Sequence, residues 1–201
     1  MASTPREQVD LVYRQMARTA GFRGFKPRFL YRTALGSGVA TAGLVAVSRF
    51  VSPRGVVIGW VACAALIAVA TTMRVLFPAL RSESAIEQET VRAVIAGMLP
   101  PLGVGATVTA AVLLRYPEGF PLLPAVWLAL FGLGISAIRP LLFASTDHVV
   151  IGYLVAAGIA FLLRSADPTT LALLVGIPFT TLHLVTGVTI QAAAPETRRS
   201  R

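Results

Sequence analysis

Residues 55–73 read GVVIGWVACAALIAVATTM, nineteen residues without a charged side chain. Arg54 stands immediately before this run and Arg74 immediately after it. A helix of that length rises about 28 Å, which is close to the thickness of the hydrocarbon core of a bilayer. The run is therefore predicted to be a transmembrane helix.

The rest of the chain repeats this pattern, because its charged residues gather at or near the ends of six apolar stretches. Of its 201 residues, 55% are hydrophobic and only 13% are charged, too few polar groups to cover a soluble domain of that size. We predict an all-α, polytopic membrane protein with a six-helix transmembrane bundle in residues 33–192. The spans are expected at about 33–48, 55–73, 93–114, 122–138, 145–163 and 168–191.

The basic residues are divided unevenly between the two ends of these spans. With the N-terminus inside, the inner segments hold 14 of the 18 Lys and Arg residues and the outer turns hold 4. Because basic residues favour the cytoplasmic side, we expect a multi-pass protein of the inner membrane with both termini in the cytoplasm. The same distribution explains the net charge of +9 without a nucleic-acid partner.

Residues 1–32 form a basic segment that is expected to be cytoplasmic, and residues 193–201 form a short basic tail on the same side. Thr4 and Pro5 suit the start of a helix. We predict an amphipathic juxtamembrane helix that lies on anionic lipid headgroups. The alternative is that its charges only hold the N-terminus in the cytoplasm. The apolar face of this helix consists of Val9, Val12, Met16 and Ala20.

Pro100 and Pro101 lie near the middle of the third expected span. Each proline removes a backbone donor, so the pair predicts a kink or a break in the helix. Transporters often place substrate sites at broken helices, although prolines are also common in membrane helices without such a role. A small transporter or permease subunit would use this break together with Thr180 and His183 of the sixth span.

Ionisable side chains are scarce inside the spans. No Lys lies in any span, which excludes a retinal Schiff base, and no acidic residue lies at mid-span, which argues against a proton-coupled pump. His148 and His183 are the only histidines, and we expect them at nearly the same depth on adjacent antiparallel helices. Such a pair can ligate a b-type haem. The alternative is that His148 meets water and His183 bonds a backbone carbonyl.

No catalytic residue, resident cofactor or metal site is predicted, and the haem remains an alternative. Cys63 is the lone cysteine, so neither an intramolecular disulfide nor a multi-thiolate metal site can form. Three acidic residues, Glu83, Glu87 and Glu89, have no histidine near them in the sequence. They are interpreted as the solvated start of the third helix.

Several short motifs resemble a family of small six-span bacterial membrane proteins of unknown function. The family pattern has a Phe-Gly-Gly-like step where this chain has Phe179-Thr180-Thr181, and it lacks a histidine at the position of His148. The resemblance implies no established activity or cofactor, and it implies a neighbouring gene for a small winged-helix regulator. The similar segments are Val12–Phe22, Pro100–Leu102, Gly105–Ala106, Thr109, Leu122–Leu128, Arg139 and Leu182–Gly187.

These observations favour a non-enzymatic sensor, accessory protein or complex-forming module of the inner membrane. The expected partners are the bilayer, anionic headgroups at residues 1–32, and a protein of a membrane complex or a soluble regulator. A small transporter and a haem-binding electron carrier are the two alternatives.

Overall fold

The computed structural model describes residues 27–83, 85–141 and 147–193, and every regular element in those ranges is helical. The α-helices are α2 (Pro27–Val47), α3 (Pro53–Thr71), α4 (Phe77–Leu80), α5 (Ala85–Leu114), α6 (Leu123–Ile138), α7 (Asp147–Leu163) and α8 (Pro168–Ala193). A π-helical turn, η1 (Thr72–Leu76), joins α3 to α4, and two 3-10 turns, η2 (Pro117–Leu122) and η3 (Arg139–Leu141), flank α6. The prediction of an all-helical chain is confirmed for the described residues.

In the described ranges, five helical segments are long and apolar enough to cross a membrane. They are α2, the rod from α3 through η1 to α4, α5, the run of η2 and α6, and α8. The helix α7 is also apolar but has 17 residues. These features support a multi-pass membrane protein, because a span needs about 20 predominantly apolar residues and a tilted or thinned bilayer accepts slightly fewer.

The predicted N-terminal amphipathic helix lies mostly outside the described residues. Pro27 to Arg32, which we assigned to the basic N-terminal segment, form the first turns of α2. Charged residues indicate where the bilayer ends, but they do not end a helix, which continues as long as its backbone hydrogen bonds do. Pro27 suits the first position of a helix. Residues 194–201 of the predicted basic tail are also outside the described ranges.

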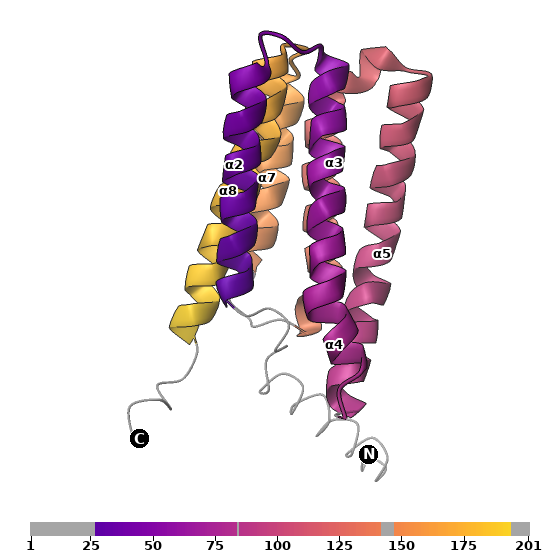
Figure 1. Ribbon diagram of the computed structural model, residues 1–201, viewed down its shortest axis with the longest axis vertical. Helices are drawn as coiled ribbons and strands as arrows, with labels where there is room; N and C mark the ends of the chain where they lie inside the picture. The colour runs from indigo at the N-terminus through magenta and orange to yellow at the C-terminus, as the bar shows by residue number, and fades with distance from the viewer. Residues whose placement is uncertain (1–26, 84, 142–146, 194–201) are drawn as a thin grey trace, which may run out of the picture.

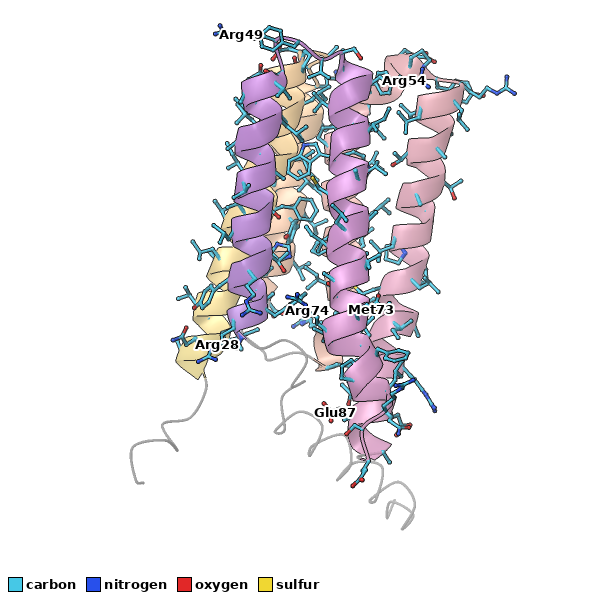
Figure 2. All side chains as sticks on the ribbon, viewed as in Figure 1. Arg28, Arg49, Arg54, Met73, Arg74 and Glu87 are labelled. Atoms are coloured by element: carbon cyan, nitrogen blue, oxygen red, sulfur yellow. The ribbon has the colours of Figure 1, made fainter. Side chains whose placement is uncertain are left out.

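Charged side chains lie towards the two ends of the helical bundle. The start of α2 and the end of α8 lie at the same end, which we call the terminal end and which is the lower one in Figure 1. Figure 2 shows Arg28, Arg74 and Glu87 towards the terminal end and Arg49 and Arg54 at the opposite, far end. The helices between them expose mainly apolar side chains, as a lipid-facing band requires.

The first and last described helices, α2 and α8, run antiparallel and lie side by side (Figure 1). At the far end the hydroxyls of Ser48 and Thr169 are 2.7 Å apart. At the terminal end the Tyr31 hydroxyl donates to Oε1 of Gln191 at 2.6 Å. These two contacts, one at each end, therefore fix a single register for α2 and α8 along the whole length that they share.

Glycines make this close contact between α2 and α8 possible. A Cβ atom added to Gly176 would collide with the side chain of Thr41, and one added to Gly187 would lie 2.7 Å from Cε1 of Tyr31. Small residues let backbones approach in lipid, where packing rather than the hydrophobic effect joins helices. Gly176 and Gly187 thus make one face of α8 an interhelical contact surface.

The helix α6 packs between α5 and α7. A Cβ on Gly134 would meet the sulfur of Met98 at 2.8 Å, and a Cβ on Gly132 would meet Cβ of Tyr153 at 3.0 Å. The indole N–H of Trp127 donates to the Thr109 hydroxyl at 2.8 Å, which ties α6 to α5. Two glycines and one hydrogen bond therefore fix α6 at the centre of three packed helices.

The helix α5 does not break at Pro100 and Pro101, so that part of the prediction is wrong. It continues from Ala85 to Leu114 through both prolines. Proline has a φ angle that a helix accepts, and the cost is the loss of the two hydrogen bonds to Ala96 and Gly97. Pro101 also packs close to Gly134 of α6, where a Cβ would lie 3.2 Å from its Cγ.

The start of α8 is capped by the side chain of Asp167. An oxygen of Asp167, Oδ2, accepts hydrogen bonds from the backbone N–H of Thr170 at 2.7 Å and from its hydroxyl at 2.8 Å. These bonds hold the pKa of the Asp167 carboxyl below its usual value, the backbone N–H contributing most. Asp167 and Pro168 together therefore define where α8 begins.

We expect Gly176→Ala to destabilise the bundle by about 1–3 kcal/mol, because the added methyl group overpacks the contact with Thr41. Thermal unfolding in detergent micelles measures the effect. Gly158→Ala is the control, since a Cβ at Gly158 meets no atom within 4 Å. Equal stability of the two variants would contradict the close contact of α2 and α8.

Candidate functional site

His183 of α8 is held by two oxygen atoms. Its Nδ1 lies 2.8 Å from the carbonyl oxygen of Phe179, one turn earlier in the same helix. The same nitrogen lies 3.1 Å from the hydroxyl of Tyr153 in α7. The predicted bond from His183 to a backbone carbonyl is therefore present, and the hydroxyl of a second helix adds to it.

These two contacts indicate which nitrogen of neutral His183 carries the proton. A carbonyl oxygen only accepts hydrogen bonds, so the 2.8 Å contact with Phe179 requires a proton on Nδ1. The Tyr153 hydroxyl then serves as a second acceptor for that N–H. The lone pair of neutral His183 is accordingly on Nε2, which is the atom that can accept a further proton.

Aromatic rings surround His183 within the bundle. The ring of Phe131 in α6 lies 5.0 Å, between centroids, from both the Tyr153 ring and the Phe179 ring. Phe179 stacks on His183 with 5.9 Å between centroids. The four rings come from three helices and form one cluster, which we call the His183 cluster: Phe131, Tyr153, Phe179 and His183.

A cavity of about 60 Å³ adjoins the His183 cluster. Its other lining residues come from the terminal halves of the helices, so the cavity lies towards the terminal end. No charged side chain is among the described residues that line it. A cavity that binds benzene measures about 150 Å³, whereas one water needs roughly 10–15 Å³. This space therefore fits water-sized guests. The lining residues are Leu30, Met98, Phe131, Ile135, Ile138, Val149, Tyr153, His183, Thr186 and Ile190.

The two histidines do not meet, so the prediction that their rings lie at one depth is wrong. His148 is exposed, and its Nε2 lies 3.3 Å from the Thr189 hydroxyl. Thr189 is six residues beyond His183, a rise of about 9 Å along α8. Side chains lean towards the N-terminus of their own helix, which separates rings on antiparallel neighbours. The pair does not fit two axial positions of one haem.

The residues of the predicted substrate path are also dispersed. Pro100 is exposed on the outer side of α5, whereas Pro101 packs towards α6. Thr180 lies against Gly38 of α2, and its buried hydroxyl has no hydrogen-bond partner among the described residues. Only His183 lines the cavity. The structure therefore brings no continuous path together from these four residues.

Sequence reasoning missed Tyr153 and Phe131, the two partners of His183 from other helices. Tyr153 is only 1% exposed, among the most buried side chains of the described chain. Buried tyrosine hydroxyls usually find a partner, so a Tyr in an apolar span was an available signal. The partner itself could not be read from the sequence, because it depends on how α7 and α8 are placed.

Within the described residues no group of three or more His, Cys, Asp or Glu side chains could hold a metal ion. At the terminal end the Arg139 guanidinium pairs with both oxygens of the Asp147 carboxylate, at 2.6 and 2.7 Å. This exposed ion pair joins the end of α6 to the start of α7. Comparisons of the chain with protein-family models, with curated proteins and with solved structures find no match.

We expect Tyr153→Phe to lower the free energy of unfolding by about 1 kcal/mol, since it removes the interhelical bond to His183 but keeps the ring. Thermal unfolding in micelles measures this loss. Tyr116→Phe, at a side chain that is 58% exposed, is the matched control and should change nothing. If both variants lost the same stability, the Tyr153 bond would not be a specific contact.

Proposed function

We propose that this chain is a six-span protein of a bacterial inner membrane that acts as a non-enzymatic sensor, with both termini in the cytoplasm. Its sensing group is His183, and the stimulus is a proton. The observation that carries the proposal is a hydrogen-bonded imidazole beside a cavity of about 60 Å³.

The size of the cavity favours a proton or water over a larger ligand. A space well below the size that holds benzene leaves no room for a typical substrate. Nε2 of His183 can take a proton while Nδ1 keeps its bond to Phe179. Histidine is the side chain that changes charge most readily between pH 5 and 8.

The surroundings of His183 are apolar enough that a positive charge on its ring would change the packing around it. The groups that face it are Tyr153 from α7, Phe131 from α6 and Phe179 from its own helix, and none of them carries a charge. A cation in such surroundings costs free energy unless water or hydroxyls rearrange around it. Protonation therefore favours a different packing of α8 against α7.

The position of the cavity directs this change towards the cytoplasm. His183 lies on α8, whose last residues lie beside the start of α2 at the terminal end (Figure 1). Both chain termini follow from these two helix ends, and either is a contact surface for a partner protein. The transporter alternative has less support, because Pro100, Pro101 and Thr180 are not among the described residues that line the cavity.

Proton sensing predicts a conformational transition on acidification that His183→Gln abolishes. A spin label on Val188, which is 53% exposed and one turn beyond His183, reports it by line shape in nanodiscs. The background is Cys63→Ala, so that the label has one attachment site. His148→Gln is the control and should keep the transition. No transition in the parent protein, or one that survives His183→Gln, would overturn the proposal.

The six-span topology predicts that single cysteines at Phe50 and Arg164 react with a membrane-impermeant maleimide in intact cells. Cysteines at Arg81 and Arg139 should react only after permeabilisation, because these positions lie at the terminal end. All are placed in the Cys63→Ala background. Reaction of Arg139 and Arg164 variants from one side would show that α7 does not cross the membrane.

A further inference from the structure

The start of α5 carries an open groove at the terminal end of the bundle. Its volume is about 550 Å³, and the described residues that line it all belong to α5: three are alanines and three have polar side chains. Charged residues lie along α5 as far as Arg92. The groove therefore begins outside the apolar band of the bundle and ends at the edge of that band. The lining residues are Ala85, Gln88, Glu89, Arg92, Ala93 and Ala96.

We propose that the N-terminal segment of the same chain, residues 1–26, docks in this groove through its apolar face. This inference is independent of proton sensing. It concerns an interaction surface and does not involve the His183 cluster.

Charge is the first argument for this occupant. The residues around the groove include three acids within seven positions, and Glu83 and Glu89 have no partner among the described residues. The N-terminal segment carries five basic residues and two acidic ones. Its basic side chains complement Glu83 and Glu89, and Glu7 or Asp10 complements Arg92, so both signs are matched.

Shape is the second argument. The apolar face of the segment was defined above as Val9, Val12, Met16 and Ala20, and three of the six described lining residues of the groove are alanines. Alanine side chains let a second helix approach closely, and the longer apolar side chains of the segment fill the space that remains. An amphipathic helix laid into such a groove buries its apolar face.

Reach is the third argument. The segment ends at Lys26, and α2 begins at Pro27 at the terminal end, where α5 also begins (Figure 1). The six residues 21–26 span up to about 20 Å when extended. This is about the width of two packed helices, which lie roughly 8–10 Å apart. Gly21 and Gly24 permit the turn that the path requires.

The test is disulfide crosslinking of the full-length Cys63→Ala protein in native membranes. Met16→Cys and Ala93→Cys, on the two apolar faces, should form an intramolecular crosslink that peptide mass spectrometry identifies. Two controls should crosslink poorly. One is Arg14→Cys with Ala93→Cys, because helical spacing predicts Arg14 outside the apolar face. The other is Met16→Cys with Phe50→Cys, because Phe50 follows Arg49 at the far end.

A charge reversal distinguishes specific docking of the segment from crosslinking by chance collision. Glu89→Lys should lower the yield of the Met16–Ala93 crosslink about fivefold, the change expected when an ion pair of roughly 1 kcal/mol is lost. Glu118→Lys, outside the groove, should leave the yield unchanged.

Three results would overturn the proposal. The first is equal crosslinking in the controls, and the second is a crosslink formed only between two chains, which would assign the groove to a second copy. The third is no crosslink together with tight binding of a peptide of residues 1–26 to anionic vesicles, which would assign the segment to lipid headgroups.

Discussion

The close contact of α2 with α8 is the constraint on which the rest of the structure depends. It exists because Gly176 and Gly187 have no side chains where Thr41 and Tyr31 approach. Once one face of α8 lies on α2, the adjacent face, with Phe179 and His183, is turned towards α6 and α7. The same contact brings the start of the first described helix and the end of the last to one end of the bundle. The site and the position of both termini thus follow from a single packed pair.

The membrane character of the fold could be predicted from charge alone, since no stretch like residues 55–73 can be covered by polar surface in water. Helix bounds were less predictable. Arg32 marks the edge of the apolar band, but α2 begins at Pro27, because hydrogen bonding and not hydropathy ends a helix. Pro100 and Pro101 predicted a kink or a break because each removes a backbone donor. The helix α5 nevertheless passes through both, because the φ angle of proline is one that a helix accepts.

The site was predictable only in part. The bond from His183 to a carbonyl one turn earlier is local, so helical spacing indicated it. The bond to Tyr153 is not local, and it depends on how two helices are rotated about their axes. The expectation that His148 and His183 lie at one depth came from the number of residues between each histidine and the turn that joins α7 to α8. Such a count compares only the depths of Cα atoms. It says nothing of the direction in which side chains lean, which is why His148 contacts Thr189 and not His183.

One consequence of the structure concerns the lipid itself. The first half of α3 is buried through Val56, Val57 and Trp60, but from Val61 to Met73 its side chains are exposed or at most half-buried. Protein contacts therefore hold α3 itself mainly through its first half, and the second half presents side chains that face lipid in a membrane. The stability of that half depends on the thickness and composition of the bilayer, so hydrophobic mismatch acts on α3 more than on α8. Detergent, which imposes no fixed thickness, removes that support.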